Sequence, residues 1–516
     1  MSFSLLVITT LQTYWTHVLV SLAVAKLLHN RFGKGISHIP GPFLASFSDL
    51  WLFIHYYRRQ GLTERDLHNK YGSPLIRLGP NTVSVGDPVA LKVVYGWKPI
   101  LRKSRLYISQ YVTAKDGTVL DNVSSTRDEK KHSVLRRAVA NAYSLGTLVE
   151  YESLVDSTTR CFFEQLESRF VKTGEVCPLS RWVQMYAFDI IGELTFSKRF
   201  GFLEGGKDID NMIYHTGKAM DYIGIMGQLP FLDEYVRLKG FGHILRKIRP
   251  TGPLMKFTSK QIDSHIATHN STRPDFLTKF LKVRAKDPQL MTDQRLATYA
   301  NTNVSAGSDT TAISLREVIF RILTHQGCLE KILTEIRILI QKRSSTGANE
   351  EELMNPITWS ESQSMSYFQA VVKESLRIHP GLGQLIPRDV PQGGMVVCGQ
   401  YLPGGTVVGC NAWTVHRDRS IFGHNADDFV PERWLECDQE KSRVMENAIF
   451  TFGAGSRVCL GKNIALLEIS KLVPEFLRRF EVTLVDPSKY TLRPGWLVLQ
   501  EGLDVKLEVR DQRVFL

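Results

Sequence analysis

The stretch Phe452-Gly453-Ala454-Gly455-Ser456-Arg457-Val458-Cys459-Leu460-Gly461, called the cysteine loop below, decides the fold class of this chain. Its three glycines let the backbone approach a flat or bulky group closely. A helical pattern opens just after Cys459, so free N–H groups and the helix dipole are expected to stabilise a thiolate there. A lone thiolate cannot build a closed zinc site, but it can be the single protein ligand of a haem iron. The alternative is a buried structural cysteine.

The composition agrees with an intracellular globular protein. The chain has 516 residues, of which 43% are hydrophobic and 22% charged, which excludes disordered, collagen-like and coiled-coil classes. It has seven cysteines and no CxxC pair, which argues against a disulfide framework and for a reducing compartment. The net charge of +12 suggests an anionic partner such as nucleic acid, a membrane surface or an acidic protein, whereas composition alone favours a solvated basic surface without a specific partner. No Lys/Arg run is long enough for a nucleic-acid-binding arm.

A second motif, Ala306-Gly307-Ser308-Asp309-Thr310-Thr311, lies inside a helical pattern predicted over Asp293–Thr324. A glycine there is expected to remove bulk where a helix passes a flat cofactor. Asp309 and Thr310 place an acid and a hydroxyl in an otherwise apolar helix, which indicates a proton relay. The alternative for Thr310 is a hydroxyl that bonds back to the preceding turn.

Charged residues recur at helical spacing elsewhere. Glu374 and Arg377 are separated by three residues, and His132 and Arg136 by four, so each pair shares one face of a predicted helix. Further single cations are Arg388 and Arg433, the latter within Phe429-Val430-Pro431-Glu432-Arg433-Trp434. For Arg136 a solvated helix face remains an alternative.

The cysteine loop matches F-x-x-G-x-R-x-C-x-G, the haem-binding signature of the cytochromes P450, at every fixed position. The other motifs occur in the order of that family, so the chain resembles a P450 over nearly its full length. The resemblance implies a mainly α fold with small β-sheets and haem b as cofactor, with Cys459 as the axial ligand of the iron. Phe452, Gly453 and Gly461 would lie beside the haem, and Asp309 and Thr310 would form the oxygen-activation pair.

The same resemblance assigns the remaining cations. Arg457, Arg388 and Arg136 are implied as donors to the haem propionates, with His132 in place of the family's tryptophan. Glu374, Arg377 and Arg433 are implied as a buried charge network that shapes the cysteine loop, in which removal of one partner would strand the others.

The implied activity is insertion of one oxygen atom from O₂ into a lipophilic small molecule. NADPH–cytochrome P450 reductase would deliver the electrons of NADPH, with cytochrome b5 as a second candidate donor. Two alternatives stay open: a haem-thiolate isomerase or dehydratase without a reductase, and a non-enzymatic haem-binding membrane protein. The motif style resembles filamentous-fungal P450s of secondary metabolism, akin to pisatin demethylase. No nucleic-acid partner is expected.

The N-terminus predicts membrane attachment. Ser2 to Ala25 carries no charge, and Lys26, Arg31 and Lys34 follow at once, which favours a single spanning helix with its C-terminal side in the cytosol. A helix on the membrane surface or in the core is the alternative. The chain therefore divides into an anchor (1–28), a basic, proline-rich hinge (29–45) and a haem domain (46–516). The predicted location is the endoplasmic reticulum membrane, with the catalytic domain on its cytosolic face.

Overall fold

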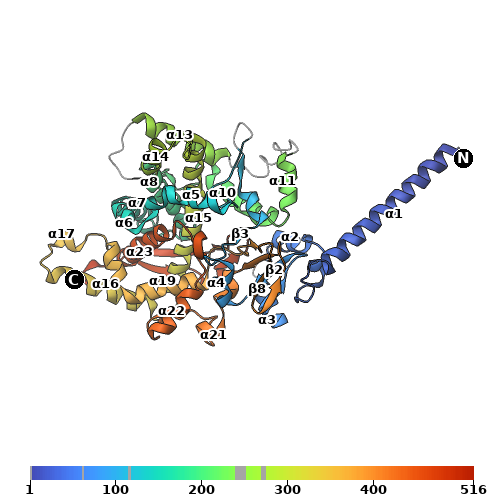
Figure 1. Cartoon of the computed structure of the whole chain (residues 1–516). Helices are drawn as coiled ribbons and strands as arrows, with labels where there is room; N and C mark the ends of the chain where they lie inside the picture. Colours follow the sequence, from blue (N-terminus) through green and yellow to red (C-terminus); the bar gives the residue numbers. More distant parts are fainter. Residues whose placement is uncertain (1–2, 61–62, 114–117, 239–251, 269–274, 516) are drawn as a thin grey trace.

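The computed structural model describes residues 3–60, 63–113, 118–238, 252–268 and 275–515. Helices make up most of the body, and some of the short strands, among them β2 (Thr82–Val85) and β8 (Met395–Val397), lie near the base of the N-terminal helix (Figure 1). The predicted mainly helical fold with small sheets is therefore confirmed.

The helices divide at the long central helix α15 (Asp293–Thr324), whose bounds equal those predicted. Before it lie α1 (Phe3–Phe32), α2 (Leu50–Tyr57), α3 (Thr63–Tyr71), α4 (Leu91–Val94), α5 (Glu129–Val139), α6 (Leu145–Glu150), α7 (Glu152–Leu166), α8 (Leu179–Phe196), α9 (Phe202–Gly205), α10 (Met212–Met226), α11 (Pro230–Leu238), α13 (Gly252–Thr268) and α14 (Phe276–Lys286). After it lie α16 (Cys328–Ser345), α17 (Glu350–Leu353), α18 (Trp359–Ser364), α19 (Ser366–Ile378), α20 (Ala412–Val415), α21 (Arg419–Phe422), the 3-10 helix η7 (Pro431–Trp434), α22 (Gln439–Ala448) and α23 (Lys462–Arg479).

Among the described residues, two sheets have three strands or more. One has the strand order β1 (Leu75–Arg77), β2 (Thr82–Val85), β10 (Val407–Cys410), β7 (Arg388–Asp389) and β3 (Arg102–Lys103), and the other has the order β11 (Phe480–Leu484), β14 (Asp504–Val509) and β6 (Cys177–Pro178). The remaining strands pair in twos: β4 (Val112–Thr113) with β5 (Val119–Leu120), β8 (Met395–Val397) with β9 (Gln400–Leu402), and β12 (Thr491–Arg493) with β13 (Leu499–Glu501).

The predicted hairpin around Gly79-Pro80-Asn81 is confirmed, with Leu75 opposite Val85 in the β1–β2 pair. β10 then pairs with β2 in parallel, which joins the C-terminal part of the chain to the N-terminal part. The sheet therefore brings Arg388, on β7, next to β3.

The core forms around α15, which packs against α8, α19 and α23. α8 is buried along nearly its whole length because its own apolar side chains lie on all faces of the helix. Thr292 caps the N-terminus of α15 by accepting a hydrogen bond from Arg295 N–H, which fixes where this helix begins. The cysteine loop enters the same core, since α23 follows it directly.

The helix α1 extends away from the body of the molecule (Figure 1). Most of its described side chains are exposed, with Tyr14 at 70% and Trp15 at 61%. In the part of the chain that the structure describes, no helix is both long enough and apolar enough to cross a bilayer, so the expected spanning helix over residues 1–28 is not supported. Polar residues interrupt the apolar run between Thr9 and His17.

A buried arginine fixes the base of α1 to the sheet. Arg77, on β1, is almost fully buried and donates hydrogen bonds to the carbonyls of Asn30 (2.6 Å) and Arg31 (2.9 Å) in the last turn of α1. Ile36 and Ile39, within the segment predicted as a hinge, are buried as well. The exit of α1 from the body is therefore held by specific contacts.

Candidate functional site

The cysteine loop is a tight turn that presents Cys459 just before α23. The N–H of Cys459 donates to the carbonyl of Phe452 at 2.8 Å, which closes the loop on itself. Gly453 and Gly455 have φ angles of +70° and +63°, a conformation that glycine adopts without strain. At Gly455 an added Cβ would lie 1.8 Å from the carbonyl oxygen of Tyr95. The shape of the loop therefore requires glycine at these two positions.

The thiol of Cys459 is accessible. Enough protein nevertheless surrounds the sulfur for burial to raise the pKa of the thiol. The N–H groups of Gly461 and Lys462 and the charge of Arg136 lower this pKa, but by less. The helix terminus and Arg136 therefore favour the thiolate, as expected from the sequence, but burial outweighs them. A metal cation on the sulfur would favour the thiolate far more strongly.

Two glycines of the loop leave room for a bulky group, and one does not. A Cβ added at Gly461 would meet no protein atom within 4 Å, and at Gly453 the nearest would be the carbonyl oxygen of Arg457 at 3.8 Å. Phe452, at the start of the loop, is half-buried. Space for a flat cofactor therefore exists at Gly453 and Gly461, whereas Gly455 serves the packing of the chain itself.

Thr310 and Asp309 face different surroundings on α15. The half-buried Thr310 donates its hydroxyl hydrogen to the carbonyl of Ala306, 2.7 Å away, so the structure has the back-bond that the sequence left as an alternative. Ala306 is exposed in the middle of the helix although Val304 and Ser308 are buried, which indicates that this face of α15 borders an internal space. Asp309 instead points to α8, where Nε2 of Gln184 donates to its Oδ1 at 2.6 Å. Consecutive helical residues are about 100° apart, so the acid and the hydroxyl diverge.

Gly307 serves the crossing of two helices. A Cβ at this position would lie 3.1 Å from Cδ1 of Ile191 on α8. The expectation that Gly307 clears space for a flat cofactor is therefore wrong, because α8 occupies that side. The small residue on the accessible face of α15 is Ala306, one position earlier.

Glu374, on α19, is the centre of a buried charge network with η7. Its carboxylate accepts hydrogen bonds of 2.7–2.9 Å from the guanidinium groups of Arg377 and Arg433, the indole of Trp434 and the N–H of Val430. Burial raises the pKa of Glu374, but these donors and the two cations outweigh it and hold the pKa below its usual value. The structure thus brings together the three residues that the sequence grouped as one network.

His416 links this network to the cysteine loop, and no motif indicated it. Its Nδ1 bonds to the carbonyl of Arg377 (2.9 Å), and its Nε2 accepts from the N–H of Phe450 (2.6 Å). Burial lowers the pKa of His416 to about 3, so the ring is neutral with its proton on Nδ1. The hydroxyl of Thr451 also donates to the carbonyl of Leu376 (2.7 Å). These bonds hold the two residues that precede the cysteine loop.

A second group of charges lies on the other elements around the loop. This cationic cluster consists of Lys103, Arg136, Arg388 and Arg457. Arg457 pairs with Glu129 at 2.6 Å, and Nη1 of Arg136 donates to the carbonyl of Val458 at 2.8 Å. Among the described residues, Glu129 is the only carboxylate that forms an ion pair with a member of the cluster. The other three cations therefore have no paired carboxylate, although the protein shields them from water.

Lys103 is the member that the sequence analysis missed. It is 7% exposed, and its ammonium lies 3.9 Å from the ring centre of Tyr107 and donates to the carbonyl of Ser124. Burial lowers its pKa well below the usual value, and the charges of Arg388 and Arg457 lower it further. Lys103 sits on the two-residue strand β3, which has no periodicity that a sequence pattern could reveal.

His132, at the position of the family's tryptophan, lies among these cations. Burial, then the charges of Arg457 and Arg136, lower its pKa to about 3, so its ring is neutral. An uncompensated group of buried cations is unfavourable unless an anion joins it. The two propionates of haem are such anions, so the donor set fits haem as a cofactor, together with the free thiol and the space at Gly453 and Gly461.

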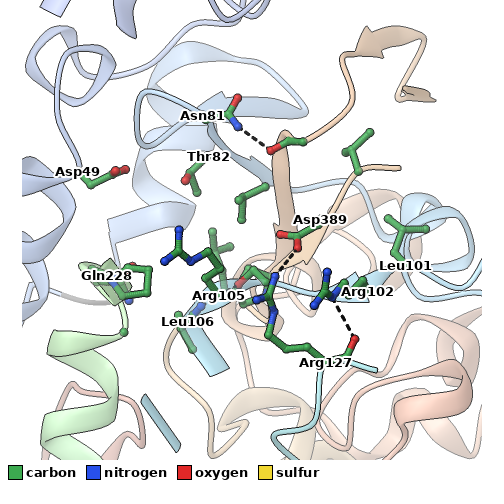
Figure 2. Close-up of a pocket in the computed structure, with 18 of the residues that line it drawn as sticks. Asp49, Asn81, Thr82, Leu101, Arg102, Arg105, Leu106, Arg127, Gln228 and Asp389 are labelled. Atoms are coloured by element: carbon green, nitrogen blue, oxygen red, sulfur yellow. Dashed lines mark hydrogen bonds and ion pairs between the residues drawn. The ribbon is translucent and has the colours of Figure 1, made fainter. Parts of the chain in front are cut away.

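A pocket of about 670 Å³ lies apart from the cysteine loop, and none of the predicted site residues lines it (Figure 2). Figure 2 shows Arg102, Arg127 and Asp389 grouped on one side, with Arg127 and Asp389 ion-paired at 3.0 Å, and Asp49 across from them. Leu106 is one of its lining residues. Leu106 belongs to a buried apolar cluster that reaches α15, the others being Tyr107, Ile223, Ile313, Trp496 and Leu497.

Comparison with known proteins agrees with this geometry. The family model for cytochrome P450 matches residues 40–507. The chain is 39% identical to a cytochrome P450 monooxygenase of Aspergillus terreus, over 87% of this chain and 90% of that protein. It is 37% identical to the cytochrome P450 monooxygenase cicH of Emericella nidulans, over 95% of this chain and 97% of that protein. It is 35% identical to the cytochrome P450 monooxygenase asR2 of Sarocladium schorii, over 93% of each. The chain therefore belongs to the cytochrome P450 family and is an oxidoreductase of the monooxygenase type.

Proposed function

We propose that this protein is a haem-thiolate monooxygenase that hydroxylates a lipophilic small molecule with electrons from NADPH, delivered by a flavoprotein reductase. The balanced reaction is RH + O₂ + NADPH + H⁺ → ROH + H₂O + NADP⁺. The observation that carries the proposal is the accessible thiol of Cys459 beside a cationic cluster in which, among the described residues, three cations have no paired carboxylate. These two features fit the iron and the two carboxylates of one cofactor.

The residues of this chain have separate tasks in that reaction. When bound, haem b would supply an iron centre that activates O₂, and the Cys459 sulfur would hold it. The cationic cluster would hold the carboxylates of the cofactor. Thr310, on the accessible face of α15, and Asp309, behind it, are the candidate groups for holding and moving the required protons. The apolar cluster that contains Ile313 and Trp496 excludes water from the substrate.

The reductase is proposed to dock over the cysteine loop. Exposed cations border it: Lys130 and Arg137 on α5, and Lys462 at the start of α23. Such a surface attracts an acidic partner and raises its association rate at low salt. Replacing all three with glutamine should slow reduction by the reductase and weaken its salt dependence. An unchanged rate with unchanged salt dependence would exclude this docking site, and cytochrome b5 can be tested on the same variants.

Membrane attachment is proposed through α1 and the surface at its base. Besides α1, large apolar side chains are exposed on the elements that follow it, among them Phe43, Leu44 and Tyr57. These residues suit the interface of the endoplasmic reticulum membrane, with the body in the cytosol. Flotation with phospholipid vesicles should carry the full chain upward, and deletion of residues 1–28 should release most of it. Equal flotation of both would place the attachment elsewhere.

The substrate is proposed to be a lipophilic product of fungal secondary metabolism. The relatives are fungal monooxygenases, and the side chains of the cluster that reaches α15 are apolar. Deleting the gene in the producing fungus and profiling its metabolites should reveal accumulation of an unoxidised precursor. An unaltered metabolite profile under conditions where the gene is expressed would contradict a biosynthetic role.

The decisive test of the class is the spectrum of the reduced protein with carbon monoxide. The thiolate should give a strongly red-shifted Soret band, and Cys459→Ser should remove it while Cys328→Ser, a buried cysteine outside the loop, keeps it. Turnover with NADPH and reductase would support the monooxygenase. Turnover of a peroxide without reductase would support the isomerase or dehydratase. Absence of turnover under both conditions would support the non-enzymatic haem binder.

A further inference from the structure

Behind Asp309 lies a chain of three buried side chains that joins α15 to α8. Oδ1 of Asp309 accepts a hydrogen bond from Nε2 of Gln184 (2.6 Å), and Oε1 of Gln184 accepts one from Nη2 of Arg316 (2.6 Å). Arg316 also donates through Nε (3.0 Å) and Nη2 (2.8 Å) to the carbonyl of Ser180. Asp309, Gln184 and Arg316 are each more than nine-tenths buried. The single amide therefore bridges an acid and a cation inside the core.

The arginine fixes which way the amide points. A guanidinium only donates hydrogen bonds, so the oxygen of Gln184 must face Arg316 and its NH₂ must face Asp309. Arg316 cannot turn aside easily, since the carbonyl of Ser180 holds it as well. Asp309 therefore always meets a donor on the α8 side, and this donor keeps its carboxyl turned away from Thr310.

The charges around Asp309 oppose its burial. Burial raises the pKa of its carboxyl to about 6, while Arg316 on α15, Gln184 on α8 and Arg493 on β12 lower it. Burial lowers the pKa of Arg316 only to about 10, so Arg316 stays charged at neutral pH. The carboxyl is thus poised between its two protonation states near neutrality, and the donor from Gln184 favours the ionised one.

We propose that Gln184 is a positioning residue for Asp309: held by Arg316, it keeps the carboxyl on the α8 side of α15 and sets the pH at which that carboxyl carries a proton. Gln184 is buried and bonds to Asp309 and Arg316, so in this proposal it acts only through Asp309. That Gln184 thereby controls the supply of protons during turnover rests on the proposed monooxygenase function. Its effect on the titration of Asp309 does not depend on that function.

The sharpest variant is Gln184→Glu, which keeps the shape of the side chain. Its carboxylate would pair with Arg316 and would stand where the amide NH₂ now donates to Asp309. Two carboxylates at hydrogen-bond distance cannot both ionise easily, so Asp309 should keep its proton to a higher pH. Gln184→Leu removes the donor without adding charge and should shift the titration in the same direction by less. If Gln184→Glu does not fold, Gln184→Leu alone tests whether Gln184 sets the titration of Asp309.

The titration can be read without turnover. The ferric holoenzyme is prepared with [4-¹³C]aspartate, and the carbonyl band of protonated aspartic acid is followed by infrared difference spectroscopy between pH 4.5 and 8.5. Asp309→Asn identifies the band, and because only aspartate carries the label, the glutamate introduced by Gln184→Glu does not contribute to it. We expect a midpoint near pH 6 in the wild type and a rise of at least one pH unit in Gln184→Glu.

Gln165→Glu, on α7, is the matched control. There too the glutamine oxygen accepts from an arginine, Nε of Arg169 at 2.9 Å, but no carboxyl of the relay is involved. This variant should leave the Asp309 band unmoved. An unmoved band in Gln184→Glu and Gln184→Leu, or an equal shift in the control, would overturn the proposal.

Turnover supplies a second readout. With reductase and NADPH, the fraction of consumed O₂ released as hydrogen peroxide should follow a pH profile displaced in Gln184→Glu by the same interval as the infrared midpoint. A change in total rate with an undisplaced profile would indicate a merely structural role and would overturn the positioning role. Absence of NADPH-dependent O₂ uptake in the wild type would contradict the proposed function instead, while the infrared result would stand.

Discussion

Two groups of buried charge flank the cysteine loop, and they differ in how their charges are balanced. In the Glu374 network the carboxylate meets two arginines and further donors, and Arg377 also donates to the carbonyls of His416 and Ala426. In the cationic cluster, Glu129 is the only paired carboxylate that the described residues provide. The first group is complete without a ligand and the second is not. Charge balance thus separates motif residues that hold the fold from those suited to bind an anion.

The largest effect should come from breaking the complete network. Glu374→Ala leaves Arg377 and Arg433 buried without their carboxylate, which costs about 3–5 kcal/mol. Against a typical stability of about 5–15 kcal/mol, this should abolish incorporation of haem. The measurement is the haem content and thermal unfolding of the purified variant. Normal haem content in Glu374→Ala or Arg377→Ala would refute the structural role of the network.

The next effect should come from Lys103→Met, which removes one cation from the incomplete cluster. The haem-free protein should become more stable, because repulsion from Arg388 and Arg457 is relieved. The affinity for haem should fall about tenfold, a change of ~1.4 kcal/mol. Differential scanning of the haem-free protein and transfer of haem to apomyoglobin measure the two effects. Loss of stability in the haem-free variant would instead make Lys103 part of the fold.

A smaller effect concerns pH. His132 has a folded pKa of about 3 and an unfolded value near 6.5, so the unfolded chain binds more protons between these values. The contribution of His132 to stability is therefore complete above pH 6.5 and falls by about 1.4 kcal/mol per unit as the pH decreases below it. In the haem-free protein, His132→Gln should flatten the decline of the melting temperature from pH 6.5 to 5.5. Parallel curves for variant and wild type would contradict this.

The smallest effect is expected at the surface. Lys373, which neighbours Glu374 in the sequence, pairs with Glu446 at 2.7 Å, but both side chains are about half exposed. Such pairs contribute only about 0–1 kcal/mol. Glu446→Ala should therefore change the free energy of unfolding in urea by less than ~0.5 kcal/mol. It serves as the surface control for Glu374→Ala, and a comparable loss in both would invalidate the comparison.

Local patterns in the sequence were sufficient for the elements that carry the site. The bounds of α15 follow from the cap at Thr292 and from helical periodicity, and the β1–β2 hairpin follows from its Gly-Pro-Asn turn. The cysteine loop is recognisable because its glycines and Cys459 lie close together in the chain. Each of these features depends on residues a few positions apart.

The residues that the sequence did not reveal act across long separations. Lys103 meets Arg388 and Arg457 only because β3 pairs with β7, and His416 reaches Arg377 from 39 residues away. The direction of Asp309 depends on Gln184 of α8, which is 125 residues earlier. No periodicity within one segment encodes such contacts, since they arise from the assembly of the sheet and the helices.

The bonds from Arg77 to the last turn of α1 have a mechanical consequence. A helix of 30 residues is about 45 Å long. The C-terminal turn of α1 is hydrogen-bonded to Arg77 of the sheet, so the helix is not joined to the body through a flexible linker alone. The orientation of α1 relative to the surface to which it attaches therefore sets the orientation of the whole body. Loosening this joint by Arg77→Ala should therefore change the orientation of the catalytic body more than its chemistry.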